Sequence, residues 1–143
     1  FQSYTNTYAP LPYLKNLFFD AVEDERIAAL SVGTRPDCLP PDVIGLLDEL
    51  NKVKPVFVEL GLQTSNEATG KLIRRGYPLY VYDEAVYKLK SIGVNVVTHM
   101  IIGLPHETVE DMSVELKANA PYSRGSLRRY KIAAFARASG NGA

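Results

Sequence analysis

Hydrophobic positions along the chain alternate between two spacings, one typical of buried strands and one typical of amphipathic helices. Short apolar runs rich in β-branched and aromatic residues predict strands at 27–33, 55–63 and 94–103. Apolar positions three and four residues apart predict helices at 12–23, from Pro41 onward, at 82–92 and at 106–118. A further short strand is expected at 1–4. Strand and helix therefore follow one another along the sequence.

Local signals place the ends of several helices. Thr64 and Glu67 form a capping-box pattern, which predicts that a helix starts at Thr64. Gly76, directly after Arg75, is a plausible residue to end that helix, and Gly93 ends the next one.

Alternating strands and helices indicate right-handed βαβ units around a parallel sheet. The sequence therefore predicts an α/β fold with at least four β/α units. Periodicity alone does not distinguish a barrel from an open sheet.

Polar clusters follow the predicted strands. "YTNTYAP", "TRPDC", "QTSNE" and "GLPHET" come after the four strands in turn, whereas "EDER", "NKVK" and "SIG" precede strands and are ordinary. Ligands of parallel α/β folds bind at the carboxyl ends of strands, because the loops there vary while the sheet stays fixed. We therefore expect a binding face at this edge.

Glu59 lies inside a predicted buried strand, where a carboxylate needs a cation or a donor nearby. It either faces a polar cavity or pairs with an arginine. Gln63, at the strand end, offers a donor and an acceptor, which suits a ribose or an amide. Arg75, or Arg74 beside it, could hold a ligand carboxylate, or could simply favour the helix dipole.

Other strand-end residues carry weaker signals. Asn6 could hydrogen-bond a ligand or hold a turn. His99 interrupts an apolar strand, where a histidine is more often a core residue than a ligand contact. Arg35 and Asp37 either pair with each other or contact a ligand. Gly103 lies where the backbone must approach another group closely.

Composition supports one domain with a real core, since the chain has 143 residues and 46% are hydrophobic. It contains one cysteine, Cys38, so an intrachain disulfide is excluded, a lone thiol cannot hold an iron–sulfur cluster, and a reducing compartment such as the cytoplasm is expected. No apolar run reaches membrane-spanning length.

Charge is unevenly distributed, although the net charge is zero. All 16 acidic residues lie at or before Glu115, and every charged residue after it is basic. The segment 118–143 is therefore expected to be a basic, irregular tail, read either as an arm that binds nucleic acid or as a terminus without function.

Taken together, "FQSYTNTYAP", "SVGTRPDCLP", "VELGLQT" with "LIRRG", and "THMIIGLPHET" resemble successive strand ends of the radical SAM superfamily. The likeness covers 1–117 and is strongest to the YhcC-like group of uncharacterised bacterial proteins. It is more distant to the Elongator catalytic subunit and to coproporphyrinogen dehydrogenase. The resemblance implies a fragment of a partial (β/α)6 TIM-like barrel with a parallel sheet.

The resemblance also implies S-adenosylmethionine and a [4Fe–4S] cluster that together generate a 5′-deoxyadenosyl radical. Gln63 would contact the ribose and Arg75 the methionine carboxylate, while Ile101 and Gly103 would contact adenine through their backbone. The residues expected at the methionyl end or the substrate are Glu59 and Asn6. His99 occupies a position where related enzymes often carry an acidic ribose contact.

The cysteine-rich cluster loop of the superfamily is not found before the first strand, and no later strand is recognisable. We therefore expect the central part of an enzyme, inactive alone and prone to self-association through unpaired sheet edges. Two alternatives stay open: a non-catalytic barrel fragment that binds a nucleotide-like ligand, or RNA through the basic tail, and a TIM-barrel hydrolase or aldolase.

Overall fold

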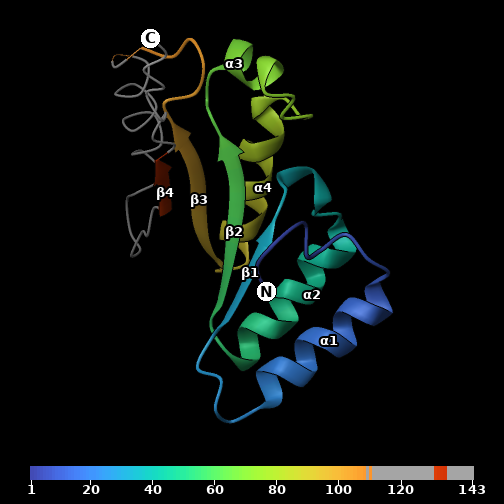
Figure 1. Ribbon diagram of the computed structural model, residues 1–143. Coiled ribbons are helices and arrows are strands. Elements are labelled where there is room, and N and C mark those ends of the chain that lie inside the picture. Colours follow the sequence, from blue (N-terminus) through green and yellow to red (C-terminus); the bar gives the residue numbers. More distant parts are fainter. Residues whose placement is uncertain (109, 111–130, 135–143) are drawn as a thin grey trace.

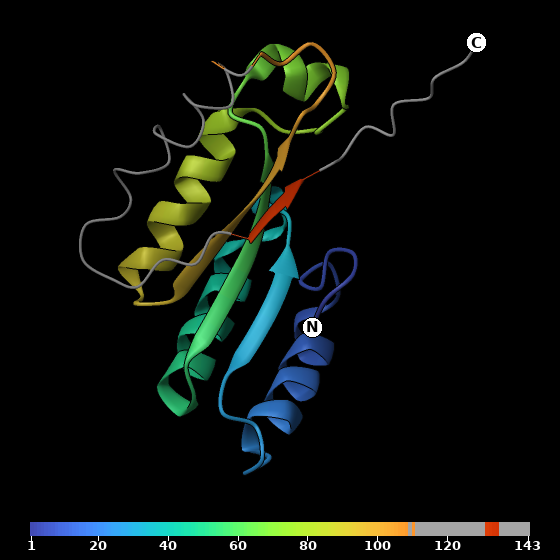
Figure 2. The same ribbon diagram turned by 60° about the vertical axis from the view of Figure 1, so that its left-hand side comes forward.

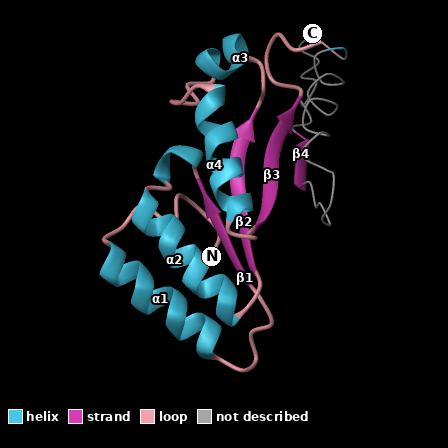
Figure 3. Ribbon diagram, turned by 180° about the vertical axis from the view of Figure 1, so that it is seen from behind, coloured by secondary structure: helices cyan, strands magenta, loops and turns pink. Residues whose placement is uncertain are grey.

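The computed structural model describes residues 1–108, 110 and 131–134. Its sheet has four parallel strands in the order β1-β2-β3-β4: Leu30–Thr34, Val56–Gln63, Asn95–Ile102 and Lys131–Ala134. The helices are α1 (Leu11–Glu23), α2 (Pro41–Val53), α3 (Glu67–Leu72) and α4 (Leu79–Ser91), with a 3-10 turn at Pro36–Cys38. The helices α1, α2 and α4 lie on one side of the strands (Figure 1; Figure 3). The predicted α/β fold with a parallel sheet is confirmed.

The two faces of the sheet differ in composition. The face toward the helices is apolar: it carries Val32, Val58 and Leu60, which pack with side chains of α1, α2 and α4 in one continuous core. The opposite face is mixed: polar and small residues alternate onto it together with a few larger apolar ones such as Phe57 and Val97. Figure 2 shows the strands in front of α2 and α4, so this second face is free of helices in the described part of the chain.

The first residues do not form the strand predicted at 1–4, although Phe1 makes ladder-like contacts with β1. Its terminal amine donates to the carbonyl of Ser31 at 2.5 Å, and the amide of Gly33 donates to the carbonyl of Phe1 at 2.9 Å. The left-handed backbone of Ser3 (φ 73) and Tyr4 (φ 61) then turns the chain away. After this turn the backbone amide of Asn6 donates to the carbonyl of Gly33 at 3.1 Å, so contact with β1 is made by Phe1 and Asn6 rather than by a continuous strand.

The helix predicted from Thr64 starts later and by a different cap. Asn66 is the N-cap, because its Oδ1 accepts from the backbone amides of Ala68 and Thr69. The capping box of Thr64 and Glu67 was wrong: Thr64 lies before the helix, and its hydroxyl donates to Glu107 at 2.8 Å. The helix ends at Leu72, well before Gly76, so the predicted end was also wrong.

Two predictions fall wholly or partly outside the described residues. Of the helix expected at 106–118, only 106–108 and 110 are described, and 106–108 are turn and loop rather than helix. The tail at 118–143 was expected to be irregular, yet Lys131–Ala134 form β4 beside β3. The rest of that tail lies outside the described residues.

Gly45 offers a direct test of α2. An added Cβ there would meet no atom within 4 Å, so alanine fits without strain. We expect Gly45→Ala to raise the free energy of unfolding by about 0.5–1 kcal/mol, because alanine loses less backbone entropy in a helix. Urea unfolding measures this change; an unchanged or lower midpoint would contradict the placement of Gly45 on open helix surface.

Candidate functional site

A cavity of about 570 Å³ opens at the carboxyl ends of β1, β2 and β3. Five of the seven residues predicted to form the site line it: Glu59, Gln63, Arg75, His99 and Ile101. Asn6 and Gly103 do not line it, although their neighbours Thr5 and Leu104 do. Contact of all seven residues with a ligand remains a prediction.

Glu59 is the most buried acid of the cavity, with 7% of its surface exposed. Its Oε1 accepts hydrogen bonds from Gln2 Nε2 and Ser31 Oγ, both at 2.6 Å. Its Oε2 lies 2.7 Å from His99 Nε2. The buried carboxylate is therefore stabilised by neighbours from different segments, one of them a histidine in place of the arginine considered from the sequence.

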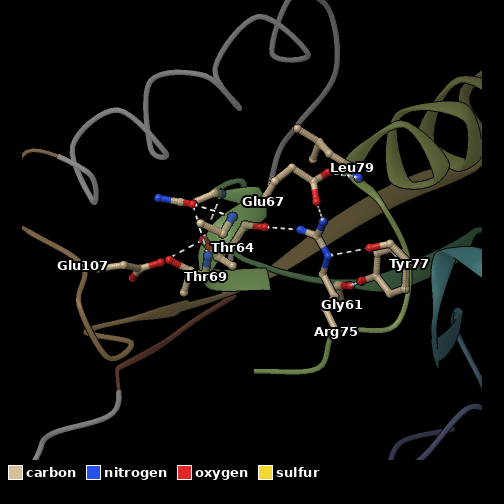
Figure 4. Close-up of polar contacts among 10 residues, drawn as sticks. Gly61, Thr64, Glu67, Thr69, Arg75, Tyr77, Leu79 and Glu107 are labelled. Atoms are coloured by element: carbon tan, nitrogen blue, oxygen red, sulfur yellow. Dashed lines mark hydrogen bonds and ion pairs between the residues drawn. The ribbon is translucent and has the colours of Figure 1, made fainter. Parts of the chain in front are cut away.

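Arg75 connects the end of β2 to the loop between α3 and α4, and its side chain is only 1% exposed. Its Nε donates to the carbonyl of Tyr77 at 2.9 Å, its Nη1 to the carbonyl of Thr64 at 2.5 Å, and its Nη2 to Glu67 at 3.0 Å (Figure 4). A guanidinium has five N–H groups, so these contacts leave two for a ligand. Arg75 thus holds the loop in place as well as lining the cavity.

Two further arginines lie at the same cavity. Arg74 is exposed and has a left-handed backbone, with φ of 55. Arg35 donates twice to Asp37, at 2.9 and 2.7 Å, which is the structural pair considered from the sequence. Through these bonds the Arg35 guanidinium holds the pKa of Asp37 below its ordinary value. Arg35 is thus paired with an acid, whereas Arg74 places an exposed cation at the rim of the cavity.

Tyr77 lies between two guanidinium groups and was not foreseen as part of the site. Arg35 and Arg75 lie 5.3 and 5.2 Å from its ring centroid, and its hydroxyl donates to the carbonyl of Gly61. Burial of the hydroxyl raises the pKa of Tyr77 to about 12. The ring therefore ties two loops to β2 in its neutral form.

The raised pKa of Tyr77 predicts a loss of stability at high pH. Because the pKa in the folded chain, about 12, lies above the ordinary 10.0, the stabilisation is complete below pH 10 and disappears as the pH rises through 12. We expect the advantage of the native chain over Tyr77→Phe to shrink by about 2–3 kcal/mol over that interval. Urea unfolding of both proteins measures it, and the other tyrosines cancel in the difference. A constant difference would contradict the prediction.

Asn6 has a structural role in the turn that follows Phe1. Its Nδ2 donates to the carbonyl of Gly33 at 2.9 Å and to that of Ser3 at 3.2 Å. This is the turn-holding alternative considered from the sequence.

The partners of Glu59 that sequence reasoning missed are Gln2 and Ser31. Only Ser31 carried a signal in the sequence, since it lies two residues before Gly33, on the same face of β1.

The residues of this chain do not fit an iron–sulfur cluster. The sequence has a single cysteine, Cys38, and among the described residues no group of three histidine, cysteine or acidic side chains is placed to hold a metal. Burial raises the pKa of the Cys38 thiol above its ordinary value, which disfavours the thiolate that metals require.

The family of the chain follows from comparison with known proteins. The model of the radical SAM superfamily matches residues 2–117. The chain belongs to the radical SAM superfamily. The resemblance predicted from the four strand-end motifs is thereby confirmed, and an unrelated TIM-barrel hydrolase or aldolase is excluded.

Two curated relatives match most of this radical SAM chain. The uncharacterised protein YtqA of Bacillus subtilis is 43% identical over 120 residues, covering 84% of this chain and 37% of YtqA. Protein YhcC of Escherichia coli is 40% identical over 108 residues, covering 75% and 35%. The chain thus spans little more than a third of the length of these relatives.

Solved radical SAM structures share the fold. Elp3 of the archaeon Methanocaldococcus infernus superposes with a TM-score of 0.73 at 22% identity, over 92% of this chain and 35% of Elp3. Coproporphyrinogen III oxidase (HemN) of Escherichia coli superposes with a TM-score of 0.74 at 21% identity, over 92% of this chain and 30% of HemN.

None of the helices in the described part of the chain combines the length and hydropathy needed to cross a bilayer.

Proposed function

We propose that this chain is the S-adenosylmethionine-binding part of a radical SAM enzyme. The observation that carries the proposal is the cavity at the carboxyl ends of β1–β3, lined by Glu59, Gln63, Arg75 and Ile101, within a chain of this superfamily. S-adenosylmethionine joins a charged amino acid to a nucleoside, and therefore needs charged, amide and apolar contacts in one cavity. These residues offer all three.

Each of these residues contacts a different part of S-adenosylmethionine in this proposal. Gln63 presents its amide to the ribose, and the two unused N–H groups of Arg75 face the methionine carboxylate. Ile101, with Gly103 beyond it, offers backbone groups to adenine. Glu59 and Asn6 belong to the methionyl end or the substrate. When bound beside a reduced [4Fe–4S] cluster, S-adenosylmethionine supplies a 5′-deoxyadenosyl radical, and the chain supplies orientation and exclusion of water.

The cluster and catalytic turnover are proposed for the whole protein rather than for this chain alone. Cysteines outside this chain would hold the cluster, since the one thiol present cannot. We propose that the protein is cytoplasmic and that its sequence divides into a barrel part at 1–117 and a tail at 118–143. We further propose that the isolated chain associates with itself through its sheet edges and does not turn over substrate alone.

Binding of S-adenosylhomocysteine, measured by calorimetry on the full chain, tests the proposal. An added Cβ at Gly61 would lie 2.7 Å from the amide nitrogen of Gln63 and would displace it. We therefore expect Gly61→Val to weaken binding about tenfold, because the displaced amide of Gln63 would lose its hydrogen bond to the ribose, worth roughly 1 kcal/mol or more. Gly45→Ala, far from the cavity, is the matched control and should bind as the native chain does. Absence of binding by a folded native chain would overturn the proposal.

A second candidate function is binding of RNA by the segment after Glu115, whose charged residues are all basic. Such binding would weaken steeply with salt, since it releases counterions. Removal of residues 122–143 should abolish it and leave the binding of S-adenosylhomocysteine intact. Absence of salt-dependent RNA affinity would dismiss this candidate.

A further inference from the structure

His99 stands in the cavity with its two ring nitrogens in different surroundings. Nε2 lies 2.7 Å from Oε2 of Glu59, whereas Nδ1 has no hydrogen-bond partner among the described residues. The side chain is 33% exposed and lines the cavity. One nitrogen is thus held by the protein while the ring remains open to a ligand.

The surroundings fix Glu59 rather than leave it to rotate. Two donors, Gln2 Nε2 and Ser31 Oγ, converge on Oε1, so Oε2 is the oxygen that faces the imidazole. The carboxylate is 7% exposed, which gives the pair strength because few waters compete. Its orientation is therefore set before any ligand enters.

Glycines on the neighbouring strands make room for both side chains. Gly33 of β1 is the register partner of Glu59, and Gly61 of β2 is the register partner of His99. Register partners of a parallel sheet point to the same face, so a larger side chain at either place would occupy the floor of the cavity. Both glycines line the cavity together with Glu59 and His99.

The partner of Nε2 determines the tautomer of the ring. An ionised carboxylate only accepts hydrogen bonds. Nε2 therefore carries the ring proton and donates a hydrogen bond to Glu59. In the neutral ring Nδ1 then holds a lone pair.

We propose that Glu59 and His99 form a carboxylate–imidazole pair whose Nδ1 accepts a proton from an O–H or N–H group of the substrate. The inference rests on the proposed function only in that the substrate enters this cavity. In the step, the lone pair of Nδ1 forms the new N–H bond and the bonding electrons of the O–H or N–H group stay on the substrate atom. The resulting imidazolium is stabilised by Glu59, which acts as a positioning residue.

Nuclear magnetic resonance of the full chain, labelled with nitrogen-15, tests the pair through the tautomer of His99. The chain has two histidines, so His106→Gln leaves one imidazole to observe. We expect two-bond proton–nitrogen correlations at mildly alkaline pH to show the proton on Nε2. A proton on Nδ1, or an equal mixture, would overturn the proposal, and this measurement needs no change at Glu59.

The isosteric variant Glu59→Gln gives a sharper outcome. Gln2 and Ser31 would keep the amide oxygen in the place of Oε1, so the amide nitrogen would face His99 and donate to Nε2. We expect the ring to switch to the Nδ1–H tautomer, and carbethoxylation of Nδ1 by diethyl pyrocarbonate to slow about tenfold, as expected for one charge-assisted hydrogen bond.

Controls separate this result from a general disturbance. Ser31→Ala removes one donor to Glu59 but keeps the carboxylate, so the Nε2–H tautomer should persist. Carbethoxylation of His106 is the internal reference in the chain that retains it. A Glu59→Gln chain that folds and keeps the native tautomer would contradict the proposal. A native chain with the Nε2–H tautomer that binds no S-adenosylhomocysteine would contradict the proposed function and still support the pair.

Discussion

Arg75→Ala should lower the free energy of unfolding by about 3–5 kcal/mol, as expected when a buried, fully bonded cation is removed. The guanidinium is 1% exposed and donates to the carbonyls of Thr64 and Tyr77, both of which would lose this donor inside the protein. Glu67 would lose one of its partners as well, although it is half exposed and still accepts from the backbone amide of Leu79. Urea unfolding monitored by circular dichroism measures the change.

The neighbouring arginine provides a matched control. Arg74 also lines the cavity but is exposed, so Arg74→Ala should change stability by no more than about 0.5 kcal/mol. If both variants lost several kcal/mol of stability, the loop between α3 and α4 would not depend specifically on the contacts of Arg75. If both lost about 0.5 kcal/mol or less, the Arg75 side chain would lie in solvent.

Phe18→Ala should destabilise the chain by about 3–5 kcal/mol, because a buried aromatic side chain is lost and a cavity remains. Phe18 lies on α1 with none of its surface exposed, and the ring of Phe1 packs edge-on against it at a centroid distance of 5.0 Å. Since Phe1 precedes Gln2, the contact also positions the amide that reaches Glu59. Loss of Phe18 should therefore loosen one side of the cavity.

Two variants of the same helix complete this test. Phe18→Leu keeps most of the volume and should cost less than about 1.5 kcal/mol. Tyr13 lies on α1 with 60% of its surface exposed, and Tyr13→Ala should change stability by about 0.5 kcal/mol or less. A Phe18→Ala chain as stable as Tyr13→Ala would show that α1 does not pack on the sheet as described.

Regular elements could be predicted because their signal is local. The helix at Leu11–Glu23 and the strand at Val56–Gln63 follow the spacing of their apolar residues within one or two positions. The cap of α3 could not be predicted with the same certainty, because the hydroxyl of Thr64 is taken by Glu107, 43 positions later. A distant partner of this kind leaves no trace in a short window.

In the site too, single residues could be predicted from the local sequence, whereas their contacts with distant residues could not. Glu59 and Gln63 stood out because polar side chains at the end of an apolar strand are costly without a purpose. The pairing of Glu59 with His99 depends on the register of β2 and β3, which no segment of the sequence specifies alone. Likewise, "RR" at 74 and 75 does not reveal which arginine is buried, since that follows from the loop conformation.

The ladder between β2 and β3 is interrupted where Gly61 pairs with His99 but Gln63 pairs with Met100, so Leu62 is the extra residue of a bulge. Bulges re-aim the side chain that follows them, and Gln63 accordingly has a left-handed backbone, with φ of 68. The strand tip is thereby uncoupled from the packed interior. Laboratory evolution of a new ligand preference could vary position 63 and the residues after it while the apolar side chains beneath remain as they are.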